Sequence, residues 1–424
     1  MERRARRVAA LLVPLVLVAL LPALAGAQSA PPTPPPTPVV LPNGSTSPSP
    51  FPTVLHTPEP SRRPPEIGAK TAILADLDTG QVLYALNPDQ QRAIASVTKI
   101  MTALLVLERT DPNDMVTVSP NAAGDGRTAG ISELGLQAGE RISVNELLYA
   151  LLLQSASDAA IALAEHVSGS VDAFVAEMNR RAQRLGLVNT EFFSPSGLDD
   201  RGHSSARDLV TITQAAYRRP GFASIVATKF HEIPAPEGEP SRIVQNRNVL
   251  LWLYPGAMGV KTGFTTKAGY CVVATAGRDG HRLIAVVLGE PGEPFSDAAA
   301  LLNYGFTAFE HVGLLEEGES LGAVVIDGHE VPVVAGGALQ GLLPSGAEPT
   351  RSIELDPSAA FPPLPGEAVG TLTVRIPEMR VGAVPVVVAS VPPPPPPTEP
   401  GPWWRRALGS LFGAVDGLLD QLFD

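Results

Sequence analysis

The chain is poor in several residue types, and each shortage excludes a class of explanation. Cys271 is the only cysteine among 424 residues, so no disulfide can form within the chain and stability must come from packing. The seven histidines are scattered and form no His-Glu-x-x-His pair, so we expect no catalytic metal and no other cofactor. The formal net charge of -12 argues against nucleic acid as a partner.

Long apolar runs are also scarce, and the only one lies at the start of the chain. The basic residues Met1–Arg7 precede the apolar run Val8–Leu24, which ends in the small residues Ala25–Ala27. This pattern is typical of a secretory signal peptide over residues 1–27. An uncleaved membrane helix is the alternative, which the short run and its two prolines disfavour. In both cases we expect the rest of the chain to be exported.

Proline, in contrast, is abundant and indicates the limits of the folded regions. Residues 28–65 are rich in Pro, Ser and Thr, which predicts an extended linker. A second proline-rich linker is expected over 391–402. Residues 403–424 carry an apolar stripe beside two arginines and three aspartates, which predicts an amphipathic helix that associates with a membrane interface. A partner-binding helix is the alternative.

Hydrophobic periodicity divides the region between the linkers into two domains, 66–311 and 312–390. In the first, strands are expected at 71–74, 82–84, 270–276 and 283–288, and helices at 96–109, 144–167 and 171–185. Strands, then helices, then strands predict an α+β domain in which helices pack on an antiparallel sheet. Short Val-rich runs after His311 predict a small all-β domain.

Lysine is rare, and two of its positions suggest chemistry. Only five of the 31 basic residues are lysines, and a buried ammonium can lose its proton whereas a guanidinium cannot. Ser96 and Lys99 lie at the start of a predicted helix, where the spacing of three places both side chains on one face. They could act as nucleophile and base, or the serine could simply cap a helix beside an exposed lysine.

Two further motifs contain residues that could complete such a site. The hydroxyls of Ser155 and Ser157 could relay a proton, or could belong to a helix cap or kink. Lys261, Thr262 and Gly263 precede a predicted strand, where they could bind a carboxylate and let a peptide backbone approach closely. Each motif alone is weak, but one acyl-transfer chemistry requires all three in this order.

On these motifs the chain resembles the low-molecular-weight penicillin-binding proteins that act as serine D-Ala-D-Ala carboxypeptidases, peptidase family S11. The resemblance runs from about Ala69 to Gly289 and includes residues 93–102, 136–140, 194–198, 207–209 and 282–289. It implies a β-lactamase/transpeptidase-like catalytic domain followed by a β-rich domain and a C-terminal amphipathic helix. The implied ligands are peptidoglycan stem peptides and β-lactams.

The resemblance also implies a role for each motif residue. Ser96 would be the nucleophile, Lys99 its base and Ser155 a proton relay to the departing D-alanine. Lys261 and Thr262, followed by Gly263, would hold the terminal carboxylate, and the N–H groups of Ser96 and Phe264 would form the oxyanion hole. Ser157 stands where the family normally has Asn, and a hydroxyl cannot replace both functions of an amide.

Two other functions share some of these features. A serine β-lactamase needs a dedicated base for deacylation, and Glu191 is the only nearby carboxylate that could serve. A catalytically weak protein that binds cell-wall peptides is suggested by the missing amide at Ser157. The carboxypeptidase interpretation predicts an enzyme that acts at the extracytoplasmic face of the cytoplasmic membrane. Residues 403–424 would make peripheral contact with that membrane.

Overall fold

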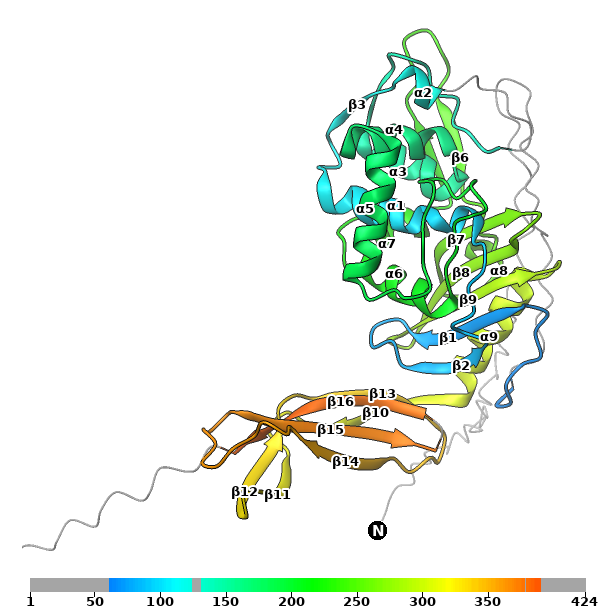
Figure 1. Cartoon of the computed structure of the whole chain (residues 1–424). Coiled ribbons are helices and arrows are strands. Elements are labelled where there is room, and N and C mark those ends of the chain that lie inside the picture. The colour runs from blue at the N-terminus through cyan, green and yellow to red at the C-terminus, as the bar shows by residue number, and fades with distance from the viewer. Residues whose placement is uncertain (1–60, 124–130, 378, 390–424) are drawn as a thin grey trace, which may run out of the picture. The chain divides into compact units, whose positions relative to one another are not determined.

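The computed structural model describes residues 61–123, 131–377 and 379–389 (Figure 1). The predicted signal peptide, residues 28–60 of the first linker, the second linker and the C-terminal helix lie outside the described residues. The described residues form a mixed α and β region followed by an all-β region.

A five-stranded antiparallel sheet forms the centre of the first region. Its order is β2-β1-β9-β8-β7, with β1 Thr71–Asp76, β2 Val82–Leu86, β7 Ala257–Thr265, β8 Gly269–Arg278 and β9 His281–Glu290. The predicted hairpin is confirmed, since Ile73 pairs with Ala85, and on its other side Ile73 pairs with Val286 near the end of the region. β7 is an edge strand that pairs only with β8.

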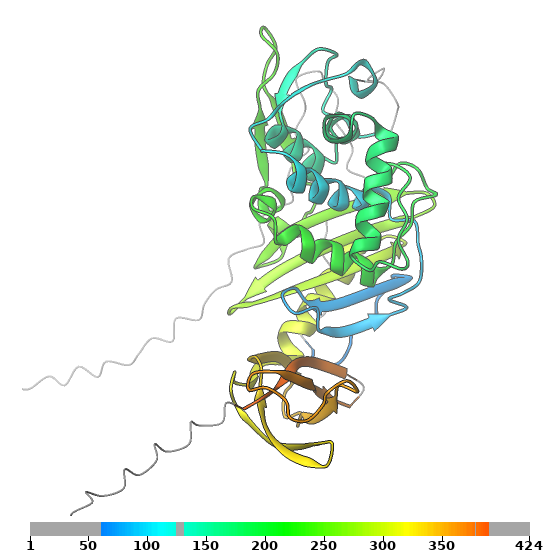
Figure 2. The same ribbon diagram turned by 60° about the vertical axis from the view of Figure 1, so that its left-hand side comes forward.

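Apolar side chains alternate between the two faces of this sheet, so each face has its own core. Ile73 and Val273 belong to the core on one face, and Leu74 and Val272 to the core on the other. The first face packs against most of the helices, and the second packs against α8 (Leu250–Leu253) and α9 (Pro294–Ala308). Figures 1 and 2 show this arrangement of helices on both sides of the sheet, which confirms the predicted α+β class.

The helices on the first face include those expected at 96–109 and 171–185. Their bounds are η1 Ala95–Thr98 (a 3-10 turn), α1 Lys99–Arg109, α2 Pro120–Ala123, α3 Val144–Tyr149, α4 Ser157–Ser168, α5 Val171–Arg184, α6 Ala206–Tyr217 and α7 Phe222–Ala227. α5 begins at the N-cap Ser170, whose side chain accepts a hydrogen bond from Ala173 N, as expected for a helix start.

The helical pattern over 144–167 corresponds to two helical segments with a break at Ser155, where a helix cap or kink was one interpretation of the motif. After α3 the chain forms a π-helical turn, η2 (Ala150–Gln154), and Ser155 then adopts a left-handed conformation with φ +69°. α4 begins two residues later. The apolar residues on both sides of the break are buried, so the sequence keeps the hydrophobic periodicity of a helix. The α-helical backbone hydrogen bonding is nevertheless interrupted there.

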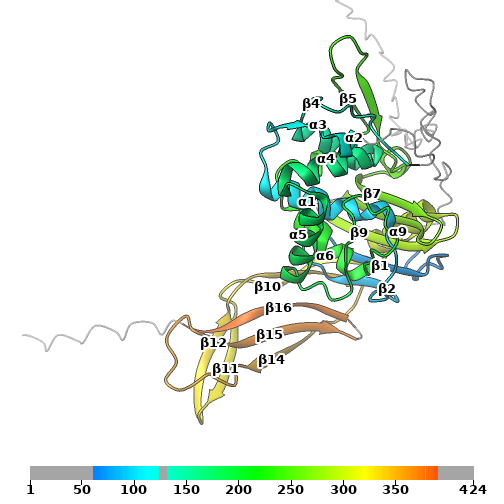
Figure 3. The ribbon, with the colours of Figure 1, turned by 45° about the horizontal axis from the view of Figure 1, so that its top comes forward.

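Two small hairpins complete the first region. β3 (Met115–Thr117) pairs with β4 (Arg141–Ser143), and β5 (Phe230–Ile233) pairs with β6 (Arg242–Gln245); Figure 3 shows the second of these beyond α2 and α3. Within the described residues, no single helix has both the length and the apolar character needed to cross a membrane, although α4 and α5 satisfy that test when taken together as a pair bent by 82°.

The second region is all-β, as predicted. One antiparallel sheet has the order β11-β12-β16-β15-β14, and β10 pairs with β13. The bounds are β10 Phe309–Leu315, β11 Ser320–Ile326, β12 His329–Ala335, β13 Leu339–Pro344, β14 Thr350–Leu355, β15 Ala368–Ile376 and β16 Met379–Val388. Val, Leu and Ile side chains from these strands form its separate core.

Candidate active site

The Ser96–Lys99 pair lies where the chain enters α1. Ala95 has a left-handed φ of +47°, and the tight η1 turn that follows carries Ser96 before α1 begins at Lys99. Lys99 Nζ donates to Ser96 Oγ at 3.1 Å and to the backbone oxygen of Ser196 at 2.7 Å. The spacing of three predicted this contact, and the second bond holds the amine in place.

Burial makes the Lys99 amine a possible base. Its side chain is fully buried, and the pKa of Lys99 is lowered to about 7, first by desolvation and second by the positive charge of Arg247, while Asp158 opposes the shift. A buried ammonium is disfavoured because a low-dielectric environment penalises charge. At neutral pH a substantial fraction of this amine is therefore uncharged and can accept a proton.

Lys261 and Arg247 bring two further cationic side chains close to Lys99. Lys261, on β7, is 1% exposed, and its pKa is lowered well below the usual range by burial, by Lys99 and by Arg247. Burial likewise lowers the pKa of Arg247 to about 10. Two buried lysines and the partly buried Arg247 act on one another, and such a site would favour an anionic ligand.

The edge of β7 lies against the nucleophile turn. An added Cβ on Gly263 would be 2.9 Å from Ile94 O and 3.0 Å from Ser96 N, so only glycine allows this close approach. Thr262 is buried. Phe264, in contrast, is 41% exposed and its ring packs against Tyr270 with centroids 4.6 Å apart. The structure thus brings the Lys-Thr-Gly motif beside Ser96.

The second motif lies at the break between η2 and α4. Ser155 is the left-handed residue at the end of η2, and Ser157 is the first residue of α4. Both are buried, and Ser157 N donates to Ser132 O at 2.8 Å. The kink that was one interpretation of this motif is therefore present, and it does not exclude the proton relay.

Three groups near the site carried no clear signal in the sequence. Arg247 follows β6 and donates to Ser132 Oγ at 2.8 Å; its charge could have suggested a role, but nothing linked it to Lys99. Asp158 accepts hydrogen bonds from the N–H groups of Leu134, Gly135 and Leu136. Ser196 contributes a backbone oxygen, which no residue type could have revealed.

Glu191 is the carboxylate that was considered as a β-lactamase base. Its side chain is exposed, and its backbone pairs with His203 in an isolated bridge. In the described part of the chain, no group of three or more His, Cys, Asp or Glu side chains could hold a metal ion. A serine and a buried lysine, beside an edge strand with a second buried lysine, define an active-site serine enzyme of the acyl-transfer type.

Comparison with known proteins identifies the family. Residues 58–292 match the peptidase S11 family, described as D-alanyl-D-alanine carboxypeptidase. The D-alanyl-D-alanine carboxypeptidase DacF of Bacillus subtilis is 36% identical over 266 residues, which cover 61% of this chain and 67% of the relative. DacC of Escherichia coli is 34% identical over 345 residues, which cover 76% of this chain and 84% of the relative.

Solved structures agree with this assignment. Penicillin-binding protein 5 from Haemophilus influenzae superposes with a TM-score of 0.67 at 33% identity, covering 77% of this chain and 98% of that one. A mutant of the Streptomyces K15 DD-transpeptidase gives a TM-score of 0.54 at 35% identity, covering 57% of this chain and 99% of that one. The chain belongs to the S11 family of D-alanyl-D-alanine carboxypeptidases.

Proposed function

We propose that this chain removes the terminal D-alanine of peptidoglycan stem peptides through an acyl-enzyme on Ser96, and that β-lactams acylate the same residue. The observation that carries the proposal is the Lys99–Ser96 pair. Its atoms are 3.1 Å apart, and the amine is buried with a pKa of about 7. A general base works best when its pKa is near the working pH.

The first step forms the acyl-enzyme. Neutral Lys99 accepts the proton of Ser96 Oγ, which attacks the carbonyl carbon of the penultimate D-alanine. The N–H groups of Ser96 and Phe264 stabilise the resulting oxyanion, usually the largest single catalytic contribution. As the peptide C–N bond breaks, Ser155 passes the proton from Lys99 to the departing nitrogen. Lys99 is then neutral again and activates the water that hydrolyses the ester.

The substrate's terminal carboxylate is held at β7. Lys261 and Thr262 are its ligands in this proposal, and Gly263 lets the peptide backbone lie along the edge strand. An arriving carboxylate favours the charged form of Lys261, whose pKa is lowered in the ligand-free site, because an opposite charge nearby stabilises an ammonium. The positive charge of Arg247 strengthens the same preference for an anion.

Ser157 limits substrate binding in this proposal. A hydroxyl donates one hydrogen bond and accepts through the same oxygen, whereas the amide of the Asn usual in the family has a separate NH₂ donor and carbonyl acceptor that can bind two partners at once. The chain therefore positions the substrate with one fewer polar contact than a typical relative would. The nucleophile and its base do not depend on that contact.

Release of D-alanine from a peptide ending in D-Ala-D-Ala tests the proposal directly. We expect D-alanine release and, with a fluorescent penicillin, a mass increase on the peptide that contains Ser96. Ser96→Ala should abolish both, and Lys99→Arg should abolish them while keeping a positive charge at position 99. Rapid penicillin turnover would instead identify a β-lactamase, and binding without an adduct or release would leave only a peptide-binding protein.

We also propose that the protein is exported and is held at the outer face of the cytoplasmic membrane by residues 403–424. The basic start and apolar run of residues 1–27 support export, and the apolar stripe of the C-terminal segment supports peripheral attachment. Deleting 401–424 should move the protein from the membrane pellet to the supernatant. Unchanged pelleting would contradict the proposal.

A further inference from the structure

One loop, residues 194–203, contacts the nucleophile side of the site. Ser196 O accepts the 2.7 Å hydrogen bond from Lys99 Nζ. Gly197 has φ +77°, and an added Cβ there would be 2.0 Å from Ala95 O, so the loop backbone packs directly on the residue before Ser96. Pro195 O accepts a 2.6 Å bond from Thr102 on α1.

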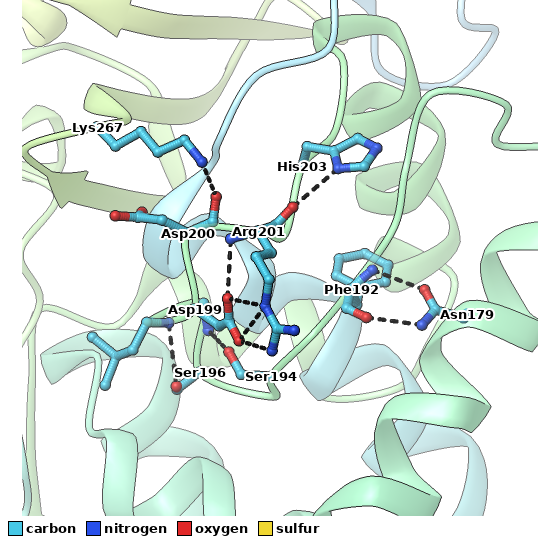
Figure 4. Close-up of polar contacts among 11 residues, drawn as sticks. Asn179, Phe192, Ser194, Ser196, Asp199, Asp200, Arg201, His203 and Lys267 are labelled. Atoms are coloured by element: carbon cyan, nitrogen blue, oxygen red, sulfur yellow. Dashed lines mark hydrogen bonds and ion pairs between the residues drawn. The ribbon is translucent and has the colours of Figure 1, made fainter.

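The same loop also contacts the end of β7 through Asp200. The Asp200 carboxylate accepts a 2.7 Å hydrogen bond from Thr265 Oγ1, and its backbone oxygen accepts a 2.7 Å bond from Lys267 Nζ. Figure 4 shows the bond from Lys267. Thr265 Oγ1 in turn accepts from Ala268 N at 3.1 Å, so its hydroxyl joins Asp200 to the turn between β7 and β8.

Hydrogen bonds inside the loop form two consecutive turns, one on each side of Leu198. Ser194 Oγ accepts from Gly197 N at 2.9 Å, and the Asp199 carboxylate accepts from the Arg201 backbone N–H and guanidinium. Gly202 N donates to Asp199 O at 3.0 Å. Figure 4 shows the Asp199–Arg201 pair beside Asp200. Leu198 N donates to Ser196 Oγ at 3.4 Å, so the turn that carries Ser196 is directly followed by the turn that carries Asp200.

Near the end of β7, Gly263 packs against the nucleophile turn and Phe264 packs against Tyr270, and Asp200 adds a contact at Thr265. β7 is the edge strand and pairs with β8 alone, and Thr265 is its last residue, paired with Gly269 across the turn. Phe264 directly precedes Thr265. An edge strand supported on one side frays at its end unless other contacts hold it, and here Asp200 supplies such a contact.

We propose that Asp200 is a positioning residue that fixes the Phe264 end of β7 relative to Ser96 and Lys99. This inference rests on the proposed roles of Ser96 and Phe264 in acylation. The 194–203 loop contacts the base through Ser196 O and the end of β7 through Asp200, so one segment joins the two sides of the site. Oxyanion donors act only within a few tenths of an ångström of their ideal position, and Asp200 maintains that placement.

Single-turnover acylation of the full chain by a fluorescent penicillin tests the inference. Complete loss of an oxyanion donor lowers the catalytic rate constant by about 100-fold to 1000-fold. A donor that is only loosened, as in Asp200→Ala, should slow acylation by about tenfold. Asp200→Asn keeps a side-chain oxygen for Thr265 and should stay within about threefold of the wild type. Thr265→Val should slow acylation as much as Asp200→Ala does, and Thr265→Ser should acylate at the wild-type rate.

The double variant Asp200→Ala/Thr265→Val distinguishes one shared contact from two independent effects. If both side chains act through the same bond, the double variant is no slower than the slower single variant. Losses that multiply would overturn the inference, as would an Asp200→Ala rate equal to the wild-type rate. Lys267→Met should cost little, since that contact is exposed and uses only the Asp200 backbone.

The labelled fraction separates positioning from a folding defect. A structural defect lowers the fraction of molecules labelled and the melting temperature, and leaves the rate constant of the active molecules unchanged; that result would overturn the inference. A displaced donor lowers the rate constant itself, with full labelling. Wild-type protein that forms no Ser96 adduct would refute the proposed function instead, so the two failures are distinguishable.

Discussion

At the scale of single residues, Lys99 shows how burial and charge are balanced in the site. Desolvation and Arg247 lower its pKa, while Asp158 raises it, and the result is a pKa of about 7. A lysine with its ordinary pKa would be almost fully protonated at neutral pH and could not act as a base. The fold therefore makes the Lys99 amine reactive by burying it and by placing the charge of Arg247 near it.

The pH dependence of acylation should report this pKa. Below pH 7 Lys99 is protonated and cannot accept the Ser96 proton, so the acylation rate constant should rise with pH and reach half its maximum near pH 7. A stopped-flow series with a fluorescent penicillin from pH 5 to 9 measures it. Lys99→Arg should be inactive throughout. A wild-type rate that does not change over this range would contradict the assignment of Lys99 as the base.

At the scale of elements, the break between η2 and α4 organises one wall of the site. The left-handed Ser155 ends η2, and α4 then starts with Ser157 and Asp158. Asp158 is 3% exposed and binds three consecutive N–H groups of the segment 134–136. The break therefore places both hydroxyls and this carboxylate at one bend, which a continuous helix would not have.

Replacing Asp158 should affect both the stability of the fold and the pKa of Lys99. Asp158→Ala leaves buried N–H groups unpaired, which should lower the free energy of unfolding by about 3 kcal/mol. Asp158→Asn retains an acceptor oxygen and should lose less. Both variants remove the negative charge that raises the pKa of Lys99, so both should shift the acylation midpoint to lower pH. Urea unfolding and the pH series measure the two effects, and a midpoint that moves upward would contradict the electrostatic account.

At the scale of the whole molecule, contacts distant in sequence close the first region. β1 lies between β2 and β9, so the start of the region pairs with residues near its end. Asp297, in the first turn of α9, accepts a 3.0 Å hydrogen bond from Ala69 N just before β1. Burial, with a further contribution from Glu293, raises the pKa of Asp297 to about 6, and burial also raises the pKa of Glu290 beside it.

Asp297 should make stability depend on pH in a defined direction. Its pKa is higher in the folded than in the unfolded chain, so the folded state binds the proton more tightly and the wild type gains stability as pH falls through about 6. Asp297→Asn lacks this gain. The melting temperature of the wild type minus that of Asp297→Asn should therefore increase as the pH is lowered from 7.5 to 5. A difference that is constant with pH would contradict the prediction.

The local features of this protein can be predicted from its residues alone. Ser96 and Lys99 meet because three residues are about one helical turn, and the hairpin, α5, β8 and β9 follow from patterns that repeat over a few residues. The cores on the two sheet faces follow from the alternation of side chains along a strand. Such features depend on neighbours in the chain, so their residue types are sufficient to predict them.

The surroundings of the Ser96–Lys99 pair depend on how distant segments pack together. Arg247 reaches the site from a distant segment, and Ser196 and Asp200 act through positions that depend on how their loop packs. The break at Ser155 keeps the apolar pattern of a helix, so periodicity could not reveal it. Desolvation, backbone oxygens and long-range packing leave no local signature in the sequence, because they arise from which segments meet and not from which residues follow one another.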